Sequence, residues 1–183
     1  AEEIEQAGVN GNLDYRADHQ GVTIDFRGIL NNINNIINAF VKPINVTAEY
    51  IDRIGKGDIP EKIDEDYKGD FKEIQNNFNL CIDSINGLID EANGITAEAA
   101  EGKLDTRGKA EKFQGDYKKI IEGINQTLDA VIGPLNVSAE YIDRIANGEI
   151  PEKITANFKG DFHEVKNNSN KLIAVLNSFS AEL

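Results

Sequence analysis

The sequence predicts an all-α protein built from tandem helix–connector–helix repeats, and three observations carry this prediction. One phrase occurs twice, 91 residues apart: NVTAEYIDRIGKGDIPEKI at 45–63 and NVSAEYIDRIANGEIPEKI at 136–154, identical at fifteen of nineteen positions. A weaker period of about 45 residues lies inside this repeat. Apolar residues also recur at alternating spacings of three and four. A chain that stacks copies of one structural unit has these properties, whereas an enzyme seldom needs two copies of a motif at constant spacing.

Composition narrows the class of protein. The net charge of −13 argues against nucleic-acid binding and against an anionic membrane surface. No run of 18 apolar residues occurs, so we expect no membrane insertion in this segment. The single cysteine, Cys81, excludes an internal disulfide framework and suits a reducing cytoplasm. Because the sequence starts at Ala1 and contains no Met, we interpret it as a segment of a longer protein.

Each repeat contains two local signals. A Gly-x-(Leu/Ile) step follows the first helical stretch, at 11–13, 57–59, 102–104 and 148–150. About a dozen residues later an Asp precedes an aromatic residue, in the pairs Asp25-Phe26, Asp70-Phe71, Asp116-Tyr117 and Asp161-Phe162. These signals divide the chain into four repeats, of which the first lacks its start: 1–42, 43–88, 89–133 and 134–183.

The connectors cannot be helical throughout. Pro60 requires an extended conformation at Ile59, and Gly57 suits the C-cap of the preceding helix. The recurring Asp suits the start of the second helix, as an N-cap or as a first-turn anion; a solvated surface charge is the alternative. The connectors of the second and fourth repeats, called the even connectors, share apolar residues that are predicted to pack against the helices: Ile59, Ile63, Ile150 and Ile154.

The second helices carry a continuous apolar seam. In the second repeat it runs into the third, through Phe71, Ile74, Phe78, Cys81, Ile85, Leu88, Ala92, Ile95 and Ala99. A period of 3.5 is typical of helices packed nearly parallel along a seam. Further apolar residues flank this stripe, and a stripe of that width fits a four-helix bundle. Because one repeat supplies only two helices, we expect a parallel homodimer to complete each bundle, and the bundles to stack into an elongated, coiled-coil-like rod.

The junctions between repeats are of two types. Pro43 lies at the first junction and Pro134 at the third, whereas the second junction, SINGLIDEANGITAEAA, contains no proline. Proline inside a helix removes a hydrogen bond and clashes with a carbonyl one turn back. We therefore expect an uninterrupted helix between the second and third repeats, and a bend or change of phase at the proline junctions.

Taken together, the repeated helix, connector and helix-start signals resemble those of the HAMP domains of bacterial chemoreceptors, sensor histidine kinases and related receptors. The resemblance rests on Pro43-Ile44 and Pro134-Leu135, on the steps Gly57-Asp58-Ile59 and Gly148-Glu149-Ile150, and on GDFKEIQNNFN, GDYKKIIEGIN and GDFHEVKNNSN. The tandem arrangement is similar to that of poly-HAMP chemoreceptors and hybrid kinases. The resemblance implies parallel dimeric four-helix bundles that pass small rotations or shifts from one repeat to the next.

The sequence therefore predicts a cytoplasmic signal relay, free or within a membrane-anchored receptor, that links a sensory domain to a chemotaxis or kinase output. We expect no enzymatic activity, cofactor or metal. The alternatives are a compact monomeric bundle that senses a small ligand, and a structural coiled-coil spacer. The residues expected to carry packing and relay are Pro43, Gly57, Ile59, Ile63, Asp70, Phe71, Cys81, Leu104, Asp116, Pro134, Gly148, Ile150, Ile154, Asp161 and Phe162.

Overall fold

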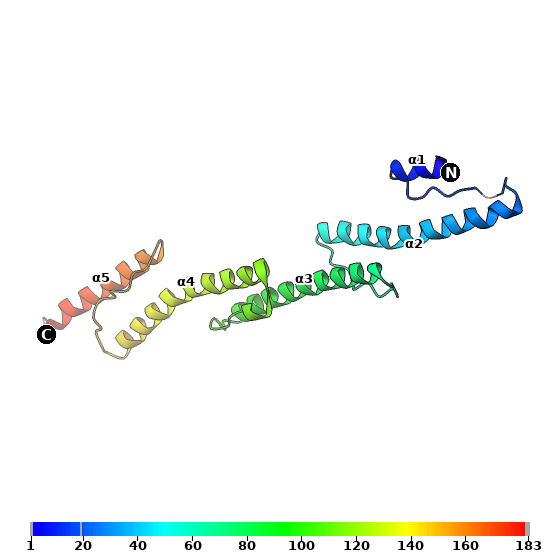
Figure 1. The fold of residues 1–183 in the computed structure, drawn as a ribbon. Helices are drawn as coiled ribbons and strands as arrows, with labels where there is room; N and C mark the ends of the chain where they lie inside the picture. The colour runs from blue at the N-terminus through cyan, green and yellow to red at the C-terminus, as the bar shows by residue number, and fades with distance from the viewer. Residues whose placement is uncertain (1, 19, 182–183) are drawn as a thin grey trace. The chain divides into compact units, whose positions relative to one another are not determined.

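The computed structural model is all-helical over the residues it describes, 2–18 and 20–181, which confirms the predicted fold class (Figure 1). Of Asp25 only the backbone is described. The helices are α1 (Glu2–Val9), α2 (Ile24–Gly55), α3 (Asp70–Ala100), α4 (Gly115–Ala146) and α5 (Phe162–Ala181), with a short 3₁₀ turn, η1 (Ala110–Lys112). Extended connectors separate the helices.

The chain divides into two compact units, Ala1–Asn86 and Gly87–Leu183. The division falls inside α3, close to the predicted end of the second repeat at residue 88. Each unit thus contains two of the four predicted repeats, one odd and one even. The unit therefore corresponds to the 91-residue period, and the repeat to the 45-residue period.

Within each unit one long helix serves two repeats. Helix α2 contains Pro43 and α4 contains Pro134, and both helices continue through the proline. Helix α3 confirms the uninterrupted helix expected between the second and third repeats, and the prolines of the other two junctions do not interrupt their helices either. The apolar residues Ile36, Phe40 and Ile44 keep their spacing across the proline. A continuous helix holds these three exposed residues on one face, where they extend the apolar stripe across the proline.

The two helices of a repeat point in the same direction because the connector runs back along them. Figure 1 shows this return path between α2 and α3, and again between α4 and α5. The connectors need extended backbone to cover the length of the preceding helix, since a strand-like residue spans about twice the rise of a helical one.

The core of each unit lies between the helices and the returning connector. The fully buried side chains come from both kinds of segment: Ile82, Ile121, Ile173, Pro60 and Pro151. The connector thus contributes to the core, and its apolar residues are held by the helices that it joins.

Candidate functional site

Every first helix ends in the same hydrogen-bonded cap. At the end of α2 the amide N–H of Asp58 donates to the carbonyl of Arg53 (2.9 Å), and that of Gly57 donates to Ile54 (2.9 Å). Gly57 has φ +81°, a left-handed conformation that favours glycine. The same pair of bonds recurs at Gly11, Gly102 and Gly148. The cap turns the chain out of the helix and starts the connector.

In the even repeats an ion pair reinforces this cap. Arg53 Nε lies 2.7 Å from Asp58 Oδ2, and Arg144 pairs with Glu149 at the equivalent positions. The hydrogen bond from Arg53 lowers the pKa of the Asp58 carboxyl, and the one from Arg144 does the same for Glu149. These pairs are exposed, so they orient the cap more than they stabilise the fold.

An asparagine of each second helix clamps the connector by its backbone. Asn79 Nδ2 donates to the carbonyl of Ile63 (3.0 Å), and its Oδ1 accepts the N–H of the same residue (2.8 Å). The other three repeats contain the same bidentate arrangement, in the pairs Asn34–Ala17, Asn125–Gly108 and Asn170–Ile154. The asparagine therefore provides a hydrogen-bond partner for both the N–H and the carbonyl of one connector residue.

A basic residue precedes each clamped residue, and in three repeats it reaches the side chain one turn beyond the clamping asparagine. Lys62 Nζ lies 2.7 Å from Asp83 Oδ2, and Arg107 Nη2 lies 2.7 Å from Asp129 Oδ1. In the first repeat, Arg16 Nε donates to Asn38 Oδ1 at 2.7 Å. This second tie holds the connector to the helix beside the clamp.

The odd connectors are fixed from within by their arginine. Besides its bond to Asp129, Arg107 donates through Nη1 to the carbonyls of Leu104 (2.7 Å) and Thr106 (2.8 Å). Arg16 makes the same two bonds, to Leu13 and Tyr15. A planar guanidinium with five donors can hold several acceptors at once. One side chain therefore folds the odd connector on itself and fastens it to the helix.

Two carboxylates of α3 also hold the third connector. Glu91 Oε1 accepts the backbone N–H of Lys109 (2.7 Å), and Glu91 Oε2 lies 3.4 Å from Lys112 Nζ. Glu98 accepts a hydrogen bond from Thr106 Oγ1. The backbone bond from Lys109 is the main cause that lowers the pKa of Glu91, and Lys112 adds to it.

Odd and even repeats fill the space under the clamp differently. In the even repeats the clamped residue is isoleucine, and Ile63 and Ile154 are buried. In the third repeat it is Gly108, where an added Cβ would lie 2.6 Å from Ile121 Cγ2 and 2.6 Å from Ile95 Cδ1. In the third repeat, isoleucines of α3 and α4 thus fill the space that a side chain on the clamped residue would need, whereas the first repeat has Ala17 at that position.

A family model for the HAMP domain matches residues 18–87 and 112–178. The chain belongs to the HAMP domain family. The two matches cover the second and fourth repeats and the second helices of the first and third. They agree with tandem HAMP domains, as the resemblance implied. No solved structure matches the chain.

The predicted packing residues of the HAMP repeats lie in several environments. Pro43, Ile63 and Ile154 are buried, whereas Ile59 and Ile150 are half-buried, as are Phe71, Phe162 and Pro134. Cys81 is exposed in the single chain, and so is Leu104. Gly57 and Gly148 form the caps described above.

Asp70, Asp116 and Asp161, three of the aspartates predicted to start the second HAMP helices, lie at different positions relative to the helix start. Asp70 is the first residue of α3, Asp116 is the second residue of α4 and lies behind the N-cap Gln114, and Asp161 precedes α5. Asp116 pairs with Lys119 at 2.7 Å. Asp70 and Asp116 therefore stand as first-turn anions, which interact favourably with the helix dipole. The side chain of Asp25 lies outside the described part.

The sequence reasoning missed the clamping asparagines. They are separated by 45, 46 and 45 residues, so the same repeat that located the glycines and aspartates contained them. Several asparagines stand next to one another in runs such as NNINN around Asn34, so the sequence alone does not show which of them binds the connector. The recurrence of an asparagine every 45 or 46 residues, at a nearly constant distance from the clamped connector residue, is the signal that could have identified these asparagines.

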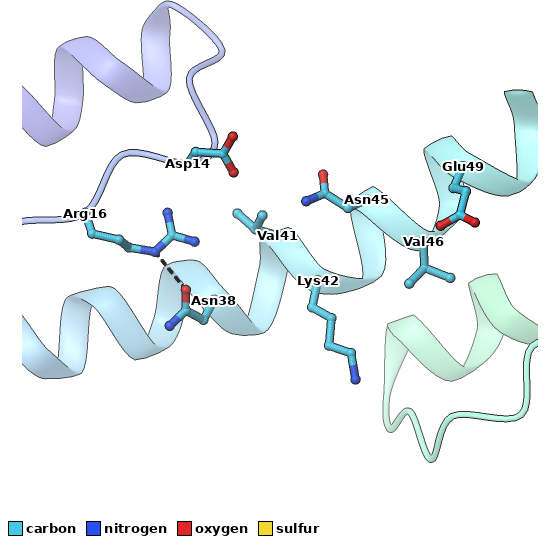
Figure 2. Close-up of a pocket in the computed structure, with 8 residues that line it drawn as sticks. All are labelled: Asp14, Arg16, Asn38, Val41, Lys42, Asn45, Val46 and Glu49. Atoms are coloured by element: carbon cyan, nitrogen blue, oxygen red, sulfur yellow. Dashed lines mark hydrogen bonds between the residues drawn. The ribbon is translucent and has the colours of Figure 1, made fainter.

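A polar hollow of about 500 Å³ lies beside the first clamp (Figure 2). Figure 2 shows Arg16 reaching Asn38, while the side chain of Lys42 points away from them. The negative charges of Asp14 and Glu49 also line the hollow, beside the positive charges of Arg16 and Lys42. The hollow is open and electrically mixed, so its chemistry selects no ligand. In the described residues we find no cluster of His, Cys, Asp and Glu fit to hold a metal, nor a helix able to span a membrane.

Proposed function

We propose that this chain is a signal-relay module that works as a parallel homodimer. HAMP domains are non-catalytic signal relays of chemoreceptors and kinases. The finer assignment is that this array transmits a conformational change from a sensory domain to a chemotaxis or kinase output, in the cytoplasm and as part of a longer receptor.

The observation that carries the proposal is the exposed seam. The spacing of three and four that defines the seam in the second repeat also places Phe26, Ile120 and Leu172 on the seams of the other three second helices. Phe26 is 61 % exposed, Ile120 48 % and Leu172 48 %. The apolar residues flanking the seam, such as Ile82 and Ile173, are buried within the same chain. The chain's own connectors therefore cover part of the flank and some seam residues, such as Ile95, and leave other seam residues exposed for another molecule.

A second copy of the chain suits that seam because its own seam has the same period and length. The N-terminal unit also has an apolar hollow of about 230 Å³, lined by residues such as Ile4, Ile36 and Phe40. Side chains of an opposing copy would fill it, and burying large apolar side chains is the main favourable term in association. A compact monomeric sensor would have to bury the seam within one chain.

The clamps favour a relay over a passive spacer. A spacer needs a continuous apolar seam and no connectors. This chain holds four connectors against their helices, each by a capped helix end and an asparagine clamp. A change in the position of a second helix therefore pulls on its connector, which couples the two helices of a repeat.

Crosslinking through Cys81 tests the parallel dimer. In a parallel, in-register dimer the two copies of Cys81 approach across the bundle, and a disulfide needs Cα atoms within about 7 Å. We expect oxidation, or a short bifunctional reagent, to give a Cys81–Cys81 dimer, together with a dimer mass by sedimentation at tens of micromolar protein.

The matched control moves the cysteine to the face of α3 opposite the seam. Asn76 is exposed and lies on that face, so the variant Asn76→Cys in a Cys81→Ser background should crosslink more slowly. If it crosslinks as fast as Cys81, or if the chain sediments as a monomer, the parallel seam and the relay built on it are wrong.

A further inference from the structure

The second and fourth repeats are two copies of one structure, and their clamps can be compared directly. Both connectors contain the sequence PEKI, at 60–63 and 151–154, and both present the isoleucine to an asparagine. We propose that the clamp of the fourth repeat is the weaker lock, so that its connector opens before the one in the second repeat. This inference concerns local stability and does not depend on the relay function.

The clamped carbonyl has fewer donors in the fourth repeat. The carbonyl of Ile63 accepts from Asn79 Nδ2 (3.0 Å) and also from Gln75 Nε2 (2.6 Å). Gln75 is only 3 % exposed and donates to Glu65 O as well (2.9 Å). The carbonyl of Ile154 accepts from Asn170 Nδ2 alone among the described residues (3.1 Å).

In the fourth repeat, Lys166 occupies the position of Gln75. Lys166 Nζ donates to the carbonyls of Thr155 (3.4 Å) and Ala156 (2.7 Å), which lie one and two residues beyond Ile154 in the connector. It therefore supports the connector beyond the clamp and leaves the clamped residue itself to Asn170. An ammonium on a flexible stem is also more costly to desolvate than an amide.

The ion pair beside the clamp is missing from the fourth repeat. Lys62 lies 2.7 Å from Asp83 in the second repeat. The equivalent residues are Lys153 and Ala174, and within the described residues Lys153 forms no ion pair. One tie between connector and second helix is therefore lost.

An aromatic contact between the two helices is lost as well. Tyr50 of α2 packs edge-to-face on Phe78 of α3, with ring centroids 6.5 Å apart. Ser169 replaces Phe78 in the fourth repeat, and the ring of Tyr141 instead lies 5.7 Å from the guanidinium carbon of Arg144 on its own helix. That contact stabilises α4 and does nothing to hold α5.

Amide hydrogen exchange of the clamped residues tests the inference on the whole chain. The N–H groups of Ile63 and Ile154 follow the same residues, PEK, so their intrinsic exchange rates are equal and any difference reports opening of the clamp. The missing second donor to the clamped carbonyl, the missing ion pair and the missing aromatic contact together predict that Ile154 exchanges faster, by about threefold or more, although the second connector also holds the hydroxyl of Tyr67, which is unpartnered among the described residues.

Reciprocal substitutions separate the clamp from other causes. The double variant Ser169→Phe, Ala174→Asp should slow exchange at Ile154 toward the rate of Ile63. The variant Asp83→Ala should speed exchange at Ile63 and leave Ile154 unchanged. The helical amides of Ile82 and Ile173, both buried, provide the reference for opening of the whole repeat.

Three results would each overturn the inference. One is equal or slower exchange at Ile154 than at Ile63. Another is exchange at Ile154 at the same rate as at Ile173, which would show that α5 unfolds together with the connector. The third is exchange at Ile154 that the double variant does not slow.

Discussion

Asn79 holds Ile63 by both polar groups of its backbone, with Nδ2 3.0 Å from the carbonyl oxygen and Oδ1 2.8 Å from the amide nitrogen. The two residues are sixteen positions apart and belong to different segments, so this amide is a direct tie between connector and second helix. All four repeats contain the same asparagine clamp between the connector and the second helix.

Replacing the clamp should destabilise the N-terminal unit. Asn79→Ala removes both bonds and leaves polar groups of the buried Ile63 without these partners, which costs about 1–3 kcal/mol of unfolding free energy. Urea unfolding followed by circular dichroism measures this loss. Asn77→Ala, an exposed position on the same helix, is the matched control and should change stability by less than about 0.5 kcal/mol. Equal losses in the two variants would show that the clamp contributes nothing.

Gly108 should not tolerate a methyl group. Its added Cβ would lie 2.6 Å from atoms of Ile95 and Ile121, so we expect Gly108→Ala to cost about 1–3 kcal/mol of unfolding free energy. Adding Ile95→Val removes the Cδ1 atom and should recover part of the loss. Gly94→Ala in α3, next to Ile95, meets no atom within 4 Å and should stabilise by about 0.5–1 kcal/mol. A stabilising Gly108→Ala would contradict the packing described for the odd repeats.

The third connector should weaken in acid. Hydrogen bonds from Lys109 and Lys112 lower the pKa of Glu91 below its ordinary value of 4.5. A carboxyl with a lowered folded-state pKa contributes stability above its unfolded pKa and loses that contribution as the pH falls through the folded value. The stability difference between the native chain and Glu91→Gln should therefore shrink as the pH falls below about 4.5.

Chemical unfolding of both chains from pH 7 to pH 3 measures that difference. The exposed Glu111→Gln serves as the matched charge control. If the difference for Glu91→Gln stayed constant over this range, the carboxylate would not hold Lys109 in solution.

Tyr67 should be more stable as phenylalanine. Its hydroxyl oxygen is buried and has no hydrogen-bond partner among the described residues, and the repeat places Phe158 at the equivalent position. Since an unsatisfied buried polar group costs about 1–3 kcal/mol, Tyr67→Phe should raise the unfolding free energy by up to that amount.

Thermal unfolding checks the prediction, with Tyr15→Phe as the comparison. Tyr15 donates to Glu3 at 2.7 Å on the surface, so its replacement should be neutral or slightly destabilising. A loss of stability in Tyr67→Phe would reveal a partner for the hydroxyl in the assembled protein.

The sequence predicted the helices and connectors because both depend on periodic signals. The spacing of apolar residues located the second helices, and Gly57 and Pro60 located a connector. The proline rule set Pro43 and Pro134 apart from the second junction, yet the helix is continuous at all three junctions. A local rule for proline was outweighed there by an apolar stripe that continues across it.

The clamps could not be predicted from local rules. Asn79 and the neighbouring Asn77 are chemically identical, and only the return path of the connector decides which one meets an unpaired backbone group. The repeat places Gly108 where the second repeat has Ile63, and this difference can be read from the sequence. That a side chain at Gly108 would collide with Ile95 and Ile121 can be seen only in the structure. Both features depend on contacts between segments.

The helices shared by two repeats also determine where the chain tolerates changes in length. Helix α2 runs from Ile24 to Gly55, and α4 runs from Gly115 to Ala146, each through its proline without interruption. Deleting one residue from such a helix would turn everything beyond it by about 100°. Asn34 would then face its connector while Ile51 and Tyr50 pointed into new surroundings. We therefore expect no insertion or deletion within these two helices, and α2 and α4 indeed have 32 residues each although many of their side chains differ.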